Sequence, residues 1–142
     1  MGAGAASLTI RLAASGGMLC AAAALAQPSL DAALAAAGDP ARGRALLIAR
    51  DPANCVLCHS VSVPELPVAG NLGPPLDGVG ARLTPGQIRL RIVDSTRFNP
   101  RSIMPRYLKT DGLIGVASEF RGKTILDAQQ VEDLVAFLST LR

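Results

Sequence analysis

The chain has few aromatic side chains and a single histidine. Its 142 residues include no tryptophan, one tyrosine and three phenylalanines, and its net charge is only +3. This composition argues against a nucleic-acid-binding surface, which needs a basic face interleaved with aromatic residues. No apolar run reaches the roughly 18 residues of a membrane-spanning helix, so no membrane span is predicted. A chain of this length has room for one domain with one core.

The first 26 residues have the pattern of a secretory signal peptide. Arg11 is their only charged residue, an uncharged stretch rich in alanine and leucine follows it, and Ala24-Leu25-Ala26 provides a small-x-small cleavage site. The alternative is an amphipathic or buried N-terminal helix, which Gly16-Gly17 would weaken. We therefore expect export to the periplasm, with the signal peptide (1–26) cleaved near Ala26.

This cleavage would also remove one cysteine and would leave two segments. Cys20 would be lost with the leader, so the exported chain would keep two of its three cysteines. Residues 27–38, mostly alanine, leucine, serine and aspartate, are predicted to form a linker or a frayed helix. Residues 39–142 are predicted to form the folded domain.

The two remaining cysteines lie in the run Cys55-Val56-Leu57-Cys58-His59. A thioredoxin-like dithiol would need a preceding strand, whereas residues 39–50 have a helical pattern. A zinc site would need four ligands, but His59 is the only histidine and no second cysteine pair exists. The third possibility is covalent haem, with thioether bonds to Cys55 and Cys58 and with His59 beneath the iron as its axial ligand. An exported chain with no other cysteine and no other histidine favours one haem c.

A six-coordinate haem needs a second axial ligand, which is usually methionine or histidine. The exported chain has one methionine, Met104, in Ser102-Ile103-Met104-Pro105. A lone methionine can also be a filler of the core. The proline after Met104 and Pro100 before it favour an extended loop, so Met104 is the predicted ligand. Lys109 and an iron with an open position are the alternatives.

Helix-start signals occur at three places. Asp39-Pro40 combines an N-cap with proline at the first helical position, and Thr84-Pro85-Gly86-Gln87 is a capping box. Asp127 caps a last helix, for which Leu126 and Val131 occupy the positions of a hydrophobic staple. The apolar face of that helix recurs every three or four residues: Val131, Leu134, Val135, Leu138 and Leu141. Because no segment alternates with a period of two over more than about five residues, the predicted fold class is all-α.

This order of motifs, with the Gly-Pro-Pro-Leu loop at 73–76, resembles the class I cytochrome c fold, in which helices pack around one covalently bound haem. In that family a small residue of the first helix meets an aromatic residue of the last, and Gly43 and Phe137 match those positions. Glycine within a helix costs about 1 kcal/mol relative to alanine, so a close backbone approach would compensate for it. A glycine with no such role is the alternative.

Longer segments narrow the resemblance to the SoxX family, the monohaem subunits of the SoxAX cytochromes of sulfur oxidation. They are GNLGPPLDGVGAR at 70–82, the stretch from Arg97-Phe98-Asn99-Pro100 to Met104-Pro105, and FRGKTILDAQQVED at 120–133. The similarity covers roughly residues 39–142. It implies haem attachment at Cys55 and Cys58 and axial ligation by His59 and Met104.

The same resemblance implies a partner and a reaction. The partner would be a SoxA-like dihaem or monohaem cytochrome in a heterodimer that acts as an L-cysteine S-thiosulfotransferase. That enzyme couples thiosulfate to a cysteine of a SoxYZ-like carrier, and this chain would accept the electrons and pass them to a small cytochrome. No residue of this chain would be catalytic. A free-standing periplasmic electron shuttle is the main alternative, and a structural or haem-storage domain is a third.

Basic residues are concentrated around the Met104 segment. Between positions 82 and 109 the sequence has only one acidic residue, Asp94, and seven basic residues: Arg82, Arg89, Arg91, Arg97, Arg101, Arg106 and Lys109. They form either a solvated helix face with arginines that pair the haem propionates, or a surface that steers an acidic partner. Both uses are compatible.

Overall fold

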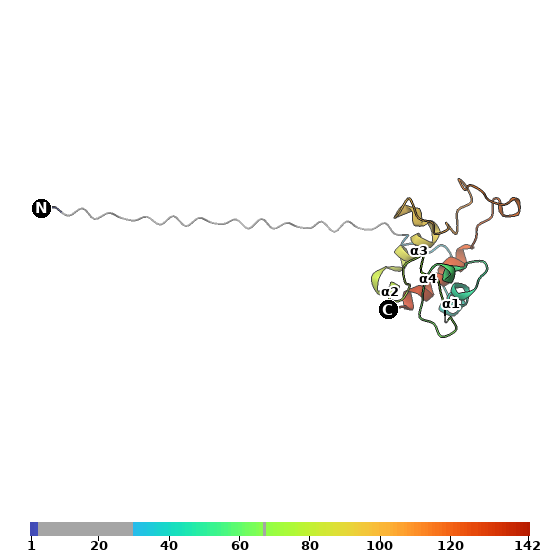
Figure 1. The fold of residues 1–142 in the computed structure, drawn as a ribbon, viewed down its shortest axis with the longest axis horizontal. Helices are drawn as coiled ribbons and strands as arrows, with labels where there is room; N and C mark the ends of the chain where they lie inside the picture. Colours follow the sequence, from blue (N-terminus) through green and yellow to red (C-terminus); the bar gives the residue numbers. More distant parts are fainter. Residues whose placement is uncertain (3–29, 67) are drawn as a thin grey trace.

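Short helices joined by long loops make up the protein (Figure 1). The computed structural model describes residues 1–2, 30–66 and 68–142. Four α-helices occur there: α1 (Pro40–Ile48), α2 (Val79–Arg82), α3 (Pro85–Asp94) and α4 (Ala128–Thr140). Single 3₁₀ turns are formed by Cys55–Leu57, Ser95–Arg97 and Ser118–Phe120. No strand occurs among the described residues, and the predicted all-α class is confirmed.

The helices begin where the capping signals predict. The Asp39 carboxylate accepts from the Ala41 N–H at 2.7 Å, with Pro40 in the first turn of α1. Thr84 and Gln87 form a reciprocal capping box at α3, and Asp127 forms one with the third residue of α4. Each cap satisfies N–H groups that have no partner within the helix.

Helices α1 and α4, which lie in the same part of the fold as α2 (Figure 1), cross at very close range. A Cβ at Gly43 would lie 1.9 Å from the Asp133 carbonyl oxygen, so only glycine fits there. The predicted close approach at Gly43 is thus confirmed, and its nearest neighbour is the backbone of Asp133, one turn before Phe137. The core under this crossing is apolar and includes Leu47, Leu126, Val131, Leu134 and Phe137.

Residues 30–38 are not helical, and they run along α3 and α4. The Leu30 N–H donates to the Gly86 carbonyl at 3.0 Å, and the Leu34 N–H donates to Glu132 Oε1 at 2.9 Å. We call residues 30–38 the N-terminal strap. The predicted signal peptide, Cys20 and the cleavage point near Ala26 lie outside the described residues, apart from Met1 and Gly2.

Candidate functional site

The Cys55–His59 run forms one tight turn after α1. The N–H groups of Cys58 and His59 both donate to the Cys55 carbonyl, at 3.2 and 3.0 Å. Cys55 and Cys58 are half-buried thiols with no disulfide. This turn therefore brings the two thiols and the imidazole of the run together in one compact group.

A backbone carbonyl fixes the imidazole of His59. His59 Nδ1 lies 2.7 Å from the Pro74 carbonyl oxygen. A carbonyl can only accept, so Nδ1 carries the proton and the lone pair of Nε2 remains available to a metal. This partner arrangement is typical of metal-binding histidines, in which it sets the ring orientation and raises the basicity of the ligand.

The 70–76 segment runs beside the Cys55–His59 turn. The Gly73 N–H donates to the Cys58 carbonyl at 2.8 Å, and the Leu76 N–H donates to the Ser60 carbonyl at 2.9 Å. A Cβ at Gly73 would lie 2.4 Å from His59 Cε1. Glycine is required at this position because the imidazole ring occupies the space of a side chain.

Met104 lies on an open pocket formed by the loop after α3. The pocket has a volume of about 560 Å³, which is within the range of roughly 300–1,000 Å³ usual for cofactor and ligand sites. It is lined by Thr96, Pro100, Ser102, Ile103, Met104, Pro105, Arg106, Leu113 and Ile125. The side chain of Met104 is half-buried against the main core.

Tyr107 connects the Met104 loop to the cysteine turn. Its hydroxyl donates to the Ala53 carbonyl at 2.7 Å, and its ring is buried. Burial raises the pKa of the Cys55 thiol to about 11, and a hydrogen bond with Tyr107 opposes that shift. Burial likewise raises the pKa of Tyr107. Before haem attachment, both groups are therefore neutral near pH 7, and the contact between the two loops carries no charge.

These residues fit a covalently bound c-type haem. The donor set is two free thiols in one turn, an imidazole with Nε2 available, and a thioether, which are the groups that hold haem c. The two segments that carry donors, and the 70–76 segment beside His59, each expose one large apolar side chain: Leu57 is 63% exposed, Ile103 is 79% and Leu72 is 72%. Exposed apolar groups beside polar donors are characteristic of cofactor sites.

The basic residues between positions 82 and 109 do not form one exposed surface in the structure. Arg89 is not on the surface, because it is buried in a two-fold ion pair with Glu132 (2.6 and 2.8 Å). The guanidinium of Arg91 lies 3.9 Å from the centre of the Phe98 ring and is half-buried. Arg82, Arg97 and Arg101 are exposed, and Arg106 and Lys109 are half-buried.

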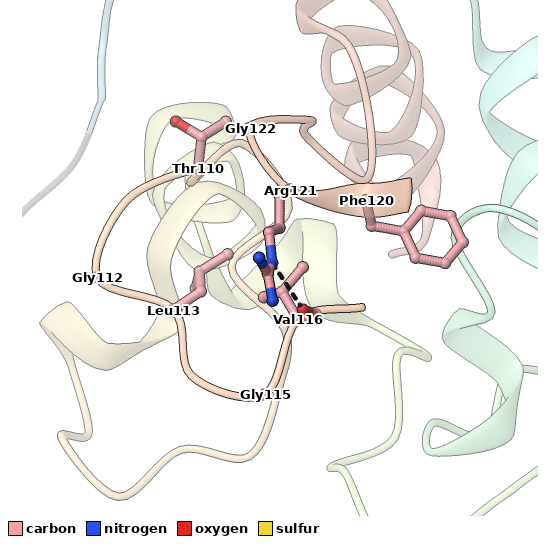
Figure 2. Close-up of a pocket in the computed structure, with 8 residues that line it drawn as sticks. All are labelled: Thr110, Gly112, Leu113, Gly115, Val116, Phe120, Arg121 and Gly122. Carbon is pink, nitrogen blue, oxygen red and sulfur yellow. Dashed lines mark hydrogen bonds between the residues drawn. The ribbon is translucent and has the colours of Figure 1, made fainter. Parts of the chain in front are cut away.

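A second pocket lies within the loop at 110–122 (Figure 2). It is lined by Thr110, Gly112, Leu113, Gly115, Val116, Phe120, Arg121 and Gly122. The side chains of Leu113 and Arg121 point toward its centre, where Arg121 Nε donates to the Val116 carbonyl, while the ring of Phe120 points away. No predicted site residue lines this pocket.

The sequence reasoning missed the groups that position the ligands. Pro74 belongs to the quoted Gly-Pro-Pro-Leu loop, but a carbonyl that accepts from His59 has no signal of its own in the sequence. Ser95 and Ser102, which contact the backbone of Met104, are ordinary serines in a loop. Only their distance in space to Met104 identifies them.

Comparisons with known proteins agree with this site. The family model "Cytochrome c" matches residues 40–142. The crystal structure of SoxXA from P. pantotrophus matches with 36% identity and a TM-score of 0.73, over 80% of this chain and 89% of that one. The structure of ferric cytochrome c-550 from Paracoccus versutus matches with 18% identity and a TM-score of 0.38, over 73% and 98% of the two chains. A search of curated protein sequences found no significant match.

The described helices include none with the length and apolar character needed to cross a membrane. The family match spans most of the chain, and the SoxXA similarity spans most of both chains. Together with the donor set at 55–59, these two matches establish one covalently bound haem c. The chain therefore belongs to the cytochrome c family, as a SoxX-like electron carrier.

Proposed function

We propose that the chain is the electron-accepting subunit of a periplasmic SoxAX-type heterodimer that oxidises thiosulfate onto a carrier cysteine. The observation that carries this proposal is the 36% identity to SoxXA, which extends over 89% of the matched chain. The partner would be a SoxA-like haem protein, and the sulfur carrier would be SoxYZ-like. Cleavage of residues 1–26 would accompany export, leaving a mature chain whose cytochrome c domain is 39–142.

The coupling reaction defines what the chain must do. Thiosulfate and a carrier thiol form one sulfur–sulfur bond, releasing two electrons and the thiol proton. Because haem provides a one-electron couple, this chain would take the two electrons one at a time and pass each to a small cytochrome. It needs no acid, base or nucleophile for this role. The partner would provide the site of sulfur chemistry.

We propose His59 and Met104 as the axial ligands, with Cys55 and Cys58 as the attachment points. The bond from His59 Nδ1 to the Pro74 carbonyl leaves Nε2 available, and Met104 lies half-buried on its pocket. Methionine ligation raises the reduction potential, which suits an acceptor of electrons. With both iron positions occupied, substrate has no open site, consistent with a carrier role.

Covalent attachment and ligation have direct tests. The protein should keep its haem stain after denaturing electrophoresis, and acid acetone should not remove the colour. The ferric holo-protein should show the weak long-wavelength absorption band of sulfur-ligated haem, and Met104→Ala should lose it. A band that persists in Met104→Ala would contradict the ligand assignment.

The complex is tested by reconstitution. The exported protein should co-purify with a larger haem subunit, and thiosulfate with the carrier protein should reduce its haem only when that subunit is present. A free-standing shuttle would instead purify alone and accept electrons from a quinol-oxidising complex but not from thiosulfate with candidate partners. That second result would replace the proposed function with the shuttle.

A further inference from the structure

Two serine hydroxyls contact both backbone polar groups of Met104. The Met104 N–H lies 3.3 Å from Ser102 Oγ, and the Met104 carbonyl oxygen lies 3.2 Å from Ser95 Oγ. The two hydroxyl oxygens are 2.8 Å apart. The three residues thus form a closed ring of contacts.

The protons of this ring can be assigned consistently. Each hydroxyl has one proton to donate, and its oxygen can accept as well. The Ser95 hydroxyl lies within donor distance of both Ser102 Oγ and the Met104 carbonyl oxygen. Because hydroxyl protons rotate, Ser102 can donate to Ser95 when Ser95 donates to the Met104 carbonyl, and the Met104 N–H donates to Ser102. This arrangement satisfies both polar groups of Met104 within the chain.

The ring is attached to a rigid element. Ser95 follows the last residue of α3 and is only 7% exposed. Its carbonyl accepts from the N–H groups of Phe98 and Asn99, at 3.1 and 3.2 Å, so the start of the loop is closed as a turn. The position of Ser95 is therefore determined by the buried helix and not by the loop that it holds.

A second anchor follows Met104. The Tyr107 N–H donates to the Ile92 carbonyl of α3 at 3.3 Å, and its hydroxyl reaches Ala53 beside the cysteine turn. Met104 lies between these two anchors, and Pro105 restricts the backbone that separates them. Without the serine ring, the loop directly before Met104 would keep local bonds around Asn99: the Ser102 N–H donates to the Asn99 carbonyl at 2.8 Å, and the Arg101 N–H donates to Asn99 Oδ1 at 3.0 Å.

We propose that Ser95 and Ser102 are positioning residues that hold the Met104 backbone so that its thioether stays on the iron. This inference rests on Met104 being the axial ligand. A fixed backbone lowers the entropy lost when the thioether binds, and so it opposes replacement of methionine by a competing ligand. The serines contact the Met104 backbone and would act on the iron only through Met104.

The test measures displacement of the thioether in the ferric holo-protein. Imidazole is titrated while the long-wavelength band is followed. Loss of one net hydrogen bond should raise the apparent affinity for imidazole about fivefold in Ser95→Ala and in Ser102→Ala, the factor that corresponds to about 1 kcal/mol. Ser102→Thr, which keeps the hydroxyl at a half-buried position, should return the affinity toward that of the wild type.

A matched control separates positioning from general stability. Ser139 Oγ donates to the Val135 carbonyl within α4 at 2.7 Å, so Ser139→Ala removes a comparable bond far from Met104 in sequence. Its imidazole affinity should equal that of the wild type. Serine variants that behave like Ser139→Ala would overturn the proposal, provided that Met104→Ala loses the band. A band that persists in Met104→Ala would instead contradict the proposed ligand itself.

Discussion

At the residue scale, the ring of His59 is confined by the backbone beside it. A Cβ at Gly73 would lie 2.4 Å from His59 Cε1 and 2.6 Å from Nδ1, well inside van der Waals contact. Gly73 cannot move away without losing its N–H bond to the Cys58 carbonyl (2.8 Å). A methyl group at this position must therefore displace the imidazole or open the contact between the two segments.

We expect Gly73→Ala to lower the free energy of unfolding of the holo-protein by about 1–3 kcal/mol, the usual cost of overpacking. The ferric spectrum should also change, because the Pro74 carbonyl and His59 Nδ1 would no longer meet at 2.7 Å. Denaturant unfolding and the visible spectrum measure the two effects. Asn71→Ala, at an exposed position of the same segment, is the control. If Gly73→Ala has the same stability and spectrum as this control, the imidazole can accommodate a methyl group at position 73 and the prediction is wrong.

At the element scale, a buried carboxylate joins α1 to α4. Asp133 accepts from Arg42 Nε at 2.7 Å and from the Asp39 N–H at the start of α1 at 2.8 Å. The Arg42 hydrogen bond is the main reason that the pKa of Asp133 is lowered to about 2. The ionised carboxylate thus holds the two helices at the crossing where Gly43 lets them touch.

This lowered pKa predicts the acid sensitivity of the crossing. Asp has an ordinary pKa near 3.9, so the stabilisation by Asp133 is fully present above about pH 4 and is lost as the pH falls toward 2. Asp133→Asn should lose on the order of 1 kcal/mol at neutral pH and should show a shallower decline between pH 4 and 2. Denaturant unfolding at several pH values measures both, with the exposed Asp111→Asn as control. Parallel pH profiles for wild type and Asp133→Asn would contradict the assigned role.

The N-terminal strap depends on the Arg89–Glu132 pair between α3 and α4. Both side chains are at most 6% exposed, and each also bonds the strap: Arg89 donates to the Leu30 carbonyl, and Glu132 accepts from the Leu34 N–H. A buried pair that loses one partner leaves an uncompensated charge, which costs about 3–5 kcal/mol. The strap should therefore loosen when the pair is broken.

We expect Glu132→Gln to lower the stability of the holo-protein strongly and to make residues 30–38 sensitive to proteases. Replacing both partners, as Arg89→Met with Glu132→Leu, should recover much of the stability, because no unpaired charge stays buried. It should not restore the protection of the strap from proteases, because the Leu30 carbonyl and the Leu34 N–H would still lack their charged partners. Unfolding curves and limited proteolysis separate these outcomes. A strap that stays protected in the double variant would mean that the remaining bonds suffice, namely Leu30 N–H to the Gly86 carbonyl and Gln129 Nε2 to the Ala36 and Ala37 carbonyls.

The helix starts could be predicted from sequence because they depend on neighbours in the chain. The capping box at Thr84 and the side-chain cap at Asp127 join residues three positions apart, and both form as predicted; the reciprocal bond that makes Asp127 a capping box is an addition by the structure. The strap could not be predicted, since its alanines have no periodic pattern and its partner Glu132 lies 98 residues from Leu34. The same reason explains Arg89, which counts as surface charge until Glu132, 43 residues away, is placed beside it.

Some groups of the candidate site could likewise be predicted from the sequence, and others could not. The Cys55–His59 run is local, so its spacing identifies the chemistry of the cofactor directly. The carbonyl that orients His59 lies 15 residues away in the chain, and the Ser95 and Ser102 hydroxyls that hold Met104 are near it in sequence but belong to a common residue type with no pattern of its own. Side chains that react can be found in a sequence, whereas groups that only position them require coordinates.

At the scale of the whole molecule, charge is distributed unevenly around the Met104 loop. Arg97 and Arg101 remain exposed after Arg89 and Arg91 are assigned to packing. Both precede Met104 in the loop whose pocket carries the proposed ligand. An acidic partner approaching that loop would be attracted before contact, and attraction between exposed charges mainly changes the association rate.

Charge reversal tests this view of docking. With the proposed SoxA-like partner, Arg97→Glu together with Arg101→Glu should slow association more than it speeds dissociation. Added salt should reduce the difference, because exposed charges are screened beyond about 8 Å at physiological ionic strength. Stopped-flow or surface-based binding kinetics measure both rates. Reversal of the exposed Arg50 and Arg142 makes the same change in net charge outside the 82–109 segment and should slow association less. The visible spectrum should stay that of the wild type in both variants, which shows that ligation and folding are intact. Equal slowing in the two double variants would mean that the partner responds to net charge alone and that the Met104 loop is not where it docks.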